Sequence, residues 1–359
     1  MRFSIMVRTK DANPAITIML TLSLAMLAFS GFAQDKPMPG YKENYWHDLS
    51  GYVDAQSSYA LDLAGKLLKS SPPVDGATLD RDAALTLIDQ VAHLPGAADL
   101  PALQHFYHQQ MKAMLLQLKT APRMSTGATI YKLYNHGFIV RTAKATYAFD
   151  FYRGPRAFVL DDSLTVELVK CCDALFVSHW HPDHADEFVA ETFLAQGKPV
   201  ITPDSVWYGK DFYGKVLHPV RNVKKLYPLQ LANGKTVYFA ALPGHQEAIL
   251  NNNYIIKDSE NLCFAQTGDQ DNADDFSWID KVRDNFRIDF LLPNCWTLNL
   301  PRMIKGYHPN IVIPGHNDEL GHTADHREAY WLNDMRAGEF KNNLVNLAWG
   351  EYYDYKISK

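Results

Sequence analysis

The spacing of apolar residues divides the chain into a helical first part and a strand-rich second part. Apolar side chains recur every three or four positions between residues 50 and 120, a spacing typical of amphipathic helices. We therefore expect helices near 52–69, 79–94 and 100–119, separated by the turn-forming stretches SPPVDG and LPGAADLP.

Beyond residue 126 the apolar residues come in short runs, rich in β-branched and aromatic side chains and bounded by turn residues. Helices are expected at 187–195, 274–285 and 323–337. The pattern predicts a mixed β/α domain over 126–359, preceded by an all-helical region over 34–125. The predicted strands are 129–135, 138–142, 146–151, 174–178, 198–202, 235–242, 252–258, 261–267, 289–294 and 310–315.

Residues 1–33 have the pattern of a secretory signal peptide. Basic residues open the segment, the uncharged run AITIMLTLSLAMLAF follows, and small residues in SGFA precede the expected cleavage after Ala33. The apolar run is shorter than the ~20 residues that a membrane-spanning helix needs. We therefore expect an exported protein, periplasmic or secreted, that keeps no stable membrane insertion after cleavage.

Composition limits the classes of partner. Of the 359 residues 47% are hydrophobic, which is enough for a large core and one or two domains. The formal net charge is -5 and no basic tract of five or more residues occurs, so binding to nucleic acid is not expected. The four cysteines are interpreted as free thiols, with a contact between Cys263 and Cys295 as the alternative.

Histidines and aspartates follow four of the predicted strands, in the motifs SHWHPDH, PGHQE, TGDQD and PGHND. Imidazole nitrogen and carboxylate oxygen are ligands for zinc, with iron and manganese as alternatives. These motifs contain no cysteine, which favours a catalytic site with an open position for water over a closed structural zinc site. The candidate metal ligands are His179, His181, Asp183, His184, His245, Asp269 and His316.

The ordered set HxHxDH, lone His, Asp and His resembles the metallo-β-lactamase-fold hydrolase superfamily, over about residues 126–350. The resemblance implies a four-layer αββα sandwich with two metal ions at one edge of its two sheets. It also implies that Asp150, at the end of TYAFDF, orients a ligand. The implied ligands are His179, His181 and His245 for the first metal, Asp183, His184 and His316 for the second, and Asp269 for both.

Details of the motifs indicate the branch of this superfamily. The stretch NHGF resembles the lactonase-like and phosphodiesterase-like branches. True β-lactamases of this fold generally lack the bridging aspartate that Asp269 would supply, and di-iron relatives have glutamate where this chain has His181. The resemblance implies a hydrolase in which two ions, with zinc expected, activate water against a small ester, lactone or phosphoester. Asp183 would orient that water and carry the proton to the leaving group.

Several alternatives stay open at this point. The same histidines suit a single-iron thiol or persulfide dioxygenase, and a non-catalytic metal-binding protein is a third hypothesis. His322 could replace His316 as a ligand or contact substrate, and Arg153 and Arg156 could contact an anionic substrate or lie in a solvated loop. The amphipathic helices favour padding of the core or contact in a homo-oligomer over a lid. The expected partner is a small-molecule substrate.

Overall fold

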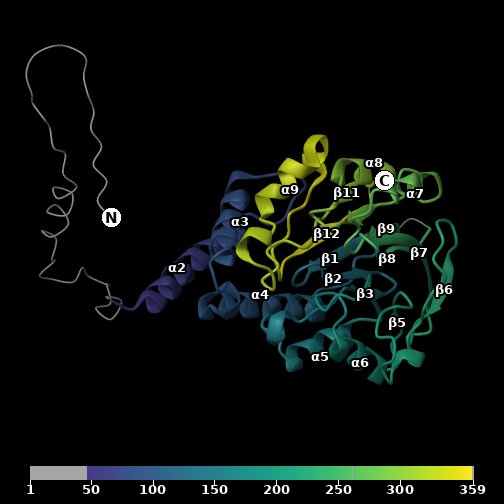
Figure 1. The fold of residues 1–359 in the computed structure, drawn as a ribbon, viewed down its shortest axis with the longest axis horizontal. Coiled ribbons are helices and arrows are strands. Elements are labelled where there is room, and N and C mark those ends of the chain that lie inside the picture. The colour runs from purple at the N-terminus through teal and green to yellow at the C-terminus, as the bar shows by residue number, and fades with distance from the viewer. Residues whose placement is uncertain (1–46, 261, 358–359) are drawn as a thin grey trace, which may run out of the picture. The chain divides into compact units, whose positions relative to one another are not determined.

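The computed structural model describes residues 47–260 and 262–357 (Figure 1). The expected signal peptide over residues 1–33 lies outside this range. The chain divides into a short unit, residues 1–52, and a large compact unit, residues 53–359, which holds every element discussed below apart from the first turn of one helix. Within the described residues, none of the helices combines the length and the apolar character that crossing a membrane requires.

The helical region is confirmed by three helices, α2 (Leu49–Ser70), α3 (Leu79–Ala92) and α4 (Pro101–Thr120). Proline at the first position of α4 suits a helix start, because its missing N–H would have no partner there. One face of α4 is buried at the spacing of a helix, and its Tyr107 packs on Trp349 with ring centroids 4.2 Å apart.

Two six-stranded sheets form the centre of the large unit, in the strand orders β12-β1-β2-β3-β4-β5 and β11-β10-β9-β8-β7-β6. The first sheet comprises β1 (Ala128–Lys132), β2 (Phe138–Thr142), β3 (Thr146–Phe149), β4 (Ala174–Phe176), β5 (Val200–Ile201) and β12 (Tyr352–Tyr355). The second comprises β6 (Tyr227–Gln230), β7 (Thr236–Gln246), β8 (Ile249–Ser259), β9 (Leu262–Gln266), β10 (Phe290–Leu292) and β11 (Ile311–Val312).

The sheets pack face to face through buried aromatic side chains. Phe176 of the first sheet meets Tyr254 of the second with ring centroids 5.1 Å apart, and both belong to one buried cluster. Helices α5 (Asp162–Cys171) and α6 (Glu187–Ala195) contribute to a second core with the outer face of the first sheet. Helices α7 (Phe276–Ile279) and α8 (Leu300–Tyr307) cover the second sheet (Figure 1).

The expected four-layer αββα sandwich is therefore confirmed, and all ten predicted strands overlap observed ones. The sequence pattern did not predict β6 and β12, which lie at sheet edges and keep partly exposed side chains. The helix expected at 274–285 is only the short α7 followed by a 3-10 turn, and that expected at 323–337 begins as α9 at Tyr330 and ends at Ala337.

Candidate metal centre

The loops that carry most of the candidate ligands leave the carboxyl ends of parallel strands. In the first sheet β3, β4 and β5 run parallel, and SHWHPDH follows β4. In the second sheet β9, β10 and β11 run parallel, with Asp269 after β9 and His316 after β11. Parallel strands end on the same side of a sheet, so loops far apart in sequence meet at one edge of the sandwich.

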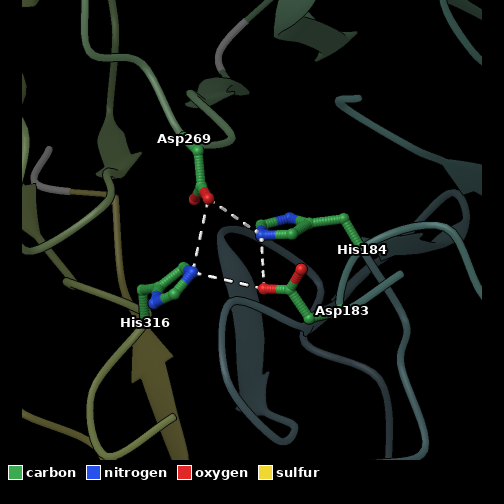
Figure 2. A group of neighbouring side chains, drawn as sticks. All are labelled: Asp183, His184, Asp269 and His316. Atoms are coloured by element: carbon green, nitrogen blue, oxygen red, sulfur yellow. Dashed lines mark ion pairs between the residues drawn. The ribbon is translucent and has the colours of Figure 1, made fainter. Parts of the chain in front are cut away.

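Four side chains at this edge face a common point (Figure 2). Oδ2 of Asp269 lies 3.2 Å from Nε2 of His184 and 3.3 Å from Nε2 of His316. Oδ2 of Asp183 lies 3.3 Å and 3.4 Å from the same two nitrogens. One ligand atom from each residue lies within 4.8 Å of all the others, a spacing that could hold one metal ion.

A second group, formed by His179, His181 and Asp269, meets the same criterion. Nε2 of His179 lies 3.7 Å from Oδ2 of Asp269, so that one carboxylate oxygen faces both groups. The structure thus brings six of the seven candidate ligands together and places Asp269 between the two groups, where a bridging ligand would lie.

His245 is the candidate ligand that joins neither group. The sequence pattern placed it on a loop, but β7 continues through Gln246 and His245 pairs with Leu250 in the β7–β8 hairpin. Its Nδ1 lies 3.1 Å from both carboxylate oxygens of Asp275, and its Nε2 lies 3.4 Å from Nη2 of Arg221.

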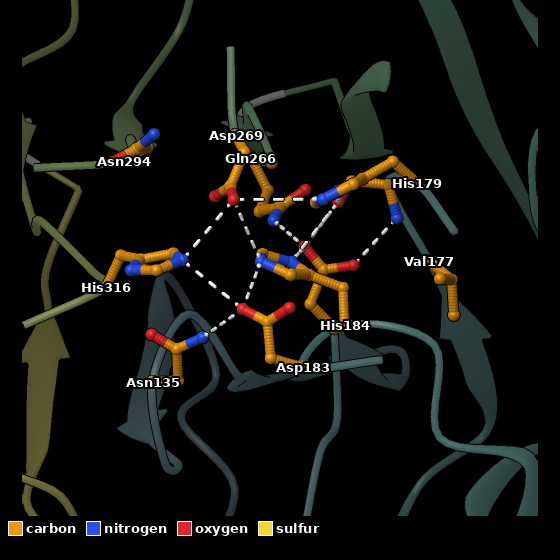
Figure 3. A network of polar contacts seen from close by, with 12 residues as sticks. Asn135, Val177, His179, Asp183, His184, Gln266, Asp269, Asn294 and His316 are labelled. Atoms are coloured by element: carbon orange, nitrogen blue, oxygen red, sulfur yellow. Dashed lines mark hydrogen bonds and ion pairs between the residues drawn. The ribbon is translucent and has the colours of Figure 1, made fainter. Parts of the chain in front are cut away.

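Asp150 contacts the candidate ligand His184, which lies in the polar network of Figure 3, and from this position it can orient that imidazole. Its carboxylate accepts hydrogen bonds from the Ser178 N–H at 2.7 Å, the Ser178 hydroxyl at 2.8 Å and the Gln266 amide at 2.6 Å. Its Oδ2 also lies 3.0 Å from Nδ1 of His184. A proton held on Nδ1 by Asp150 leaves Nε2 as the metal-binding nitrogen.

Sequence reasoning missed the polar residues that fix the aspartate ligands. The Asn135 amide donates to Oδ2 of Asp183 at 2.8 Å, and Oδ1 of Asn251 accepts from the Asp269 N–H at 3.0 Å. The buried Lys132 ammonium donates to the Asn135 carbonyl oxygen, which also accepts from the His316 N–H. The signals were present in NHGF and in the run NNN at 251–253, because uninterrupted amides in a buried strand require partners.

Backbone strain is concentrated at the same edge. Asn135, Asp150 and His316 have φ angles of 54°, 40° and 73°, in the left-handed region that few non-glycine residues adopt. Such conformations cost about 1–3 kcal/mol each and persist where surrounding structure enforces them, as it does at functional sites. Hydrogen bonds enforce them here, since each of the three residues makes at least one of those described above.

The donor set fits a pair of first-row divalent ions. Nε2 of His179, Nε2 of His184 and Oδ1 of Asp269 are buried and make no hydrogen bond to the described residues. Buried polar atoms without partners are costly, and all three belong to the ligand groups. Bound cations would satisfy them, and the histidine–carboxylate composition suits zinc, iron or manganese.

The charges of the ligand groups support cation binding. Burial alone lowers the pKa of His184, but the carboxylates of Asp269, Asp183 and Asp150 outweigh it and hold that pKa well above its ordinary value. Burial also lowers the pKa of His316, but the carboxylates of Asp269 and Asp183 outweigh it and raise that pKa to about 10. Burial raises the pKa of both Asp183 and Asp269, yet the neighbouring histidines hold it well below its ordinary value. Both carboxyl groups are therefore ionised and available to a cation.

The remaining candidates take other roles. His322 is exposed and belongs to neither ligand group. Arg153 pairs with Asp162 and Asp186, and Arg156 pairs with Asp99. All four cysteines lie in the described part of the chain and are free thiols.

Fold and site together give an αββα sandwich with histidine and aspartate ligand groups at one edge. No family model and no curated protein matches the chain. A metallo hydrolase from the archaeon Ignicoccus hospitalis is 14% identical, with a TM-score of 0.49, over 65% of this chain and 100% of its own.

Two further solved structures are similar. A possible metal-dependent hydrolase from Veillonella parvula is 15% identical, with a TM-score of 0.46, over 64% of this chain and 100% of its own. The diiron β-hydroxylase of Streptomyces venezuelae is 13% identical, with a TM-score of 0.43, over 66% of this chain and 55% of its own.

Proposed function

We propose that this protein is a metal-dependent hydrolase that uses two ions, with zinc the expected metal, on a small ester, lactone or phosphoester. The observation that carries the proposal is the pair of ligand groups that share one oxygen of Asp269. A structural site needs one closed set of ligands, whereas two adjacent groups with a shared carboxylate suit two-metal hydrolysis.

When bound, the two ions would lower the pKa of a water molecule and polarise the carbonyl or phosphoryl group of the substrate. Asp183 suits proton transfer because its side chain is 20% exposed, while those of Asp269 and His316 are each 2% exposed. The Asn135 amide holds Oδ2 of Asp183 in place, so the other oxygen can orient water and pass a proton to the leaving group.

A hollow beside the ligands supports a small-molecule substrate. A cavity of about 440 Å³ is lined in part by Trp296 and Asp271. The Trp296 ring meets the ligand His316 edge-on with centroids 5.5 Å apart, and the Asp271 N–H donates to the His245 carbonyl oxygen at 2.8 Å. The cavity therefore adjoins the candidate ligand His316 and the end of β7 that carries His245, a position that suits a substrate site.

The proposal is tested by a panel of esters, lactones and phosphodiesters assayed with zinc and with manganese. We expect Asp183→Ala and His181→Ala to lose at least about 100-fold in turnover, because each removes a ligand-group side chain that reaches the open side of the centre. His326→Ala, which changes a histidine with a 75% exposed side chain, is the control and should keep full activity. Full turnover in either site variant would show that the site is assigned wrongly.

We also propose export to the periplasm or the medium, on the sequence of residues 1–33 alone. Fractionation of cells expressing the full chain, with N-terminal sequencing of the product, tests this. A product that begins after Ala33 outside the cytoplasm supports it, and a cytoplasmic product that keeps the segment contradicts it.

A further inference from the structure

Arg221 contacts His245, the candidate ligand that joins neither ligand group, although it belongs to none of the ligand motifs itself. Its Nη2 donates to the Gly244 carbonyl oxygen and lies 3.4 Å from Nε2 of His245. The contact to Gly244 does not involve the imidazole, so it holds the guanidinium in place whichever partner Nε2 of His245 takes. Arg221 is half-buried between the β7–β8 hairpin and solvent.

The guanidinium of Arg221 differs from the other arginines considered as substrate contacts. Arg153 and Arg156 each have a carboxylate partner. Among the described residues Arg221 forms no ion pair within 4 Å, and the carboxylates of Asp275 and Asp204 act on it only from further away. Its buried Nε makes no hydrogen bond to the described residues. The ammonium of Lys132, the other cation near the ligands, is fully buried and bonded to a backbone carbonyl, so it cannot meet a substrate.

Burying a cation costs free energy when the hydrogen bonds that it made to water are not replaced by bonds to the protein. Arg221 therefore gains from a ligand that accepts hydrogen bonds from its free N–H groups. A guanidinium presents five N–H donors in a planar fork that matches the oxygens of phosphate or carboxylate. The surroundings otherwise oppose anions, since Asp183 and Asp269 are ionised. Bound ions would offset these charges, and Arg221 adds a positive group outside the ligand set for a further oxyanion of the substrate.

We propose that Arg221 binds an oxyanion carried by the substrate and so selects substrates with a phosphate or carboxylate group next to the bond that is broken. This inference rests on the proposed hydrolase function and deepens it. It favours phosphoesters, and esters that carry a free carboxylate, over neutral esters and lactones.

Kinetics with paired substrates test the inference. For Arg221→Gln we expect KM for an aryl phosphodiester to rise about tenfold or more, because a charge-assisted hydrogen bond is lost, while kcat/KM for a neutral aryl acetate stays within about twofold. Arg221→Lys keeps the positive charge but lacks the planar set of N–H donors, so its KM for the phosphodiester should lie between those of the wild type and Arg221→Gln. Arg283→Gln, the same change at an exposed arginine, is the control.

A binding measurement gives a readout that does not depend on turnover. Calorimetry of the zinc-loaded protein with inorganic phosphate, and separately with acetate, should show a dissociation constant about tenfold weaker in Arg221→Gln for the anion that the site accepts. The two anions distinguish the phosphate from the carboxylate source. Zinc content per chain should be equal in the wild type, Arg221→Gln and the control.

Three results would overturn the inference: unchanged KM and anion binding in Arg221→Gln, an equal loss with the neutral acetate, or a loss of zinc from that variant. The last would mean that Arg221 supports His245 instead of binding substrate. A wild-type protein that binds no metal and hydrolyses nothing would instead refute the proposed function. A wild type that hydrolyses only neutral esters and binds neither anion would refute this inference alone.

Discussion

At the scale of single residues, the candidate ligands depend on the polar residues behind them. The Asp150 carboxylate lies against Nδ1 of His184, and the Ser178 hydroxyl that donates to Asp150 lies 3.0 Å from Nδ1 of His179. These contacts fix both imidazoles through Nδ1 and leave Nε2 of each ring facing the ligand groups. One buried carboxylate thus sets the orientation of a histidine in each group.

Asp150→Asn should weaken zinc binding by about 10- to 100-fold, because an amide places N–H groups against donors and no longer holds the proton of His184. Competition with a chromogenic zinc chelator measures the affinity. Asp62→Asn, the same change on the exposed face of α2, is the control and should bind zinc as the wild type does. Equal affinities in all three proteins would show that Asp150 does not act on the ligands.

Lys132 gives a prediction for the dependence of stability on pH. Burial lowers its pKa to about 7, whereas the unfolded chain keeps the ordinary value of 10.5. Between these values the unfolded state binds more protons, so the contribution of Lys132 to stability rises with pH, by at most about 1.4 kcal/mol per unit. Lys132→Met lacks this contribution.

The measurement is urea unfolding of chelator-treated protein from about pH 7 to about pH 9. The free energy of unfolding of the wild type, minus that of Lys132→Met, should increase as the pH rises. The exposed Lys66→Met serves as control and should follow the wild type. Parallel curves for the wild type and Lys132→Met would contradict the shifted pKa.

Which residues could be predicted from sequence depends on whether their signal is local. The ligands His179 to His184 form one linear motif after a strand, so residue type and spacing were sufficient. Arg221 and Asn135 act through contacts to residues 23 to 48 positions away, which no spacing along the chain expresses. His245 has the right residue type, but its contacts to Arg221 and Asp275 depend on the tertiary fold.

At the scale of elements, turns after strands bring the ligands together. Gly268 links β9 to Asp269 with φ 53°, and a Cβ there would lie 2.3 Å from both Oδ1 of Asn251 and Cβ of Ser178. The turn thus fits between the two sheets only without a side chain. Strand content could be predicted from the apolar runs, whereas the edge strands β6 and β12 could not, because half-exposed edges carry weak patterns.

Gly268→Ala should lose both stability and zinc affinity, because the new Cβ must displace Ser178 or Asn251. Gly197→Ala is a matched control, since Gly197 has φ 68° but a Cβ added there would meet no atom within 4 Å. The control should cost only the backbone strain, about 1–2 kcal/mol, and keep its zinc. Chemical denaturation and zinc titration measure both. Equal losses in the two variants would show that the turn is not tightly fitted.

At the scale of the whole molecule, the helical region is joined to the sandwich by buried polar contacts as well as apolar packing. Arg81 of α3 donates to the Asn346 carbonyl oxygen and to both carboxylate oxygens of Glu351, just before β12. Arg327, in the segment after His316, donates to the carbonyl oxygen of Ala92 at the end of α3. The helices therefore brace the loop that follows a candidate ligand, which apolar periodicity alone could not predict.

Arg81→Met should reduce the free energy of unfolding by about 3–5 kcal/mol, because it leaves the Glu351 carboxylate, whose side chain is only 10% exposed, without its cation. Lys257→Met breaks an ion pair whose Glu260 is 88% exposed and should cost at most about 1 kcal/mol. Urea unfolding compares the two. A similar small cost for both would mean that this contact does not hold the helices to the sandwich.

Elemental analysis of the purified protein, alongside Asp269→Asn, tests the two-metal centre most directly. We expect about two zinc ions per chain in the wild type, and fewer in Asp269→Asn, because the shared oxygen of Asp269 faces both ligand groups. A single iron per chain, or metal content that Asp269→Asn leaves unchanged, would contradict a two-metal centre at this edge of the sandwich.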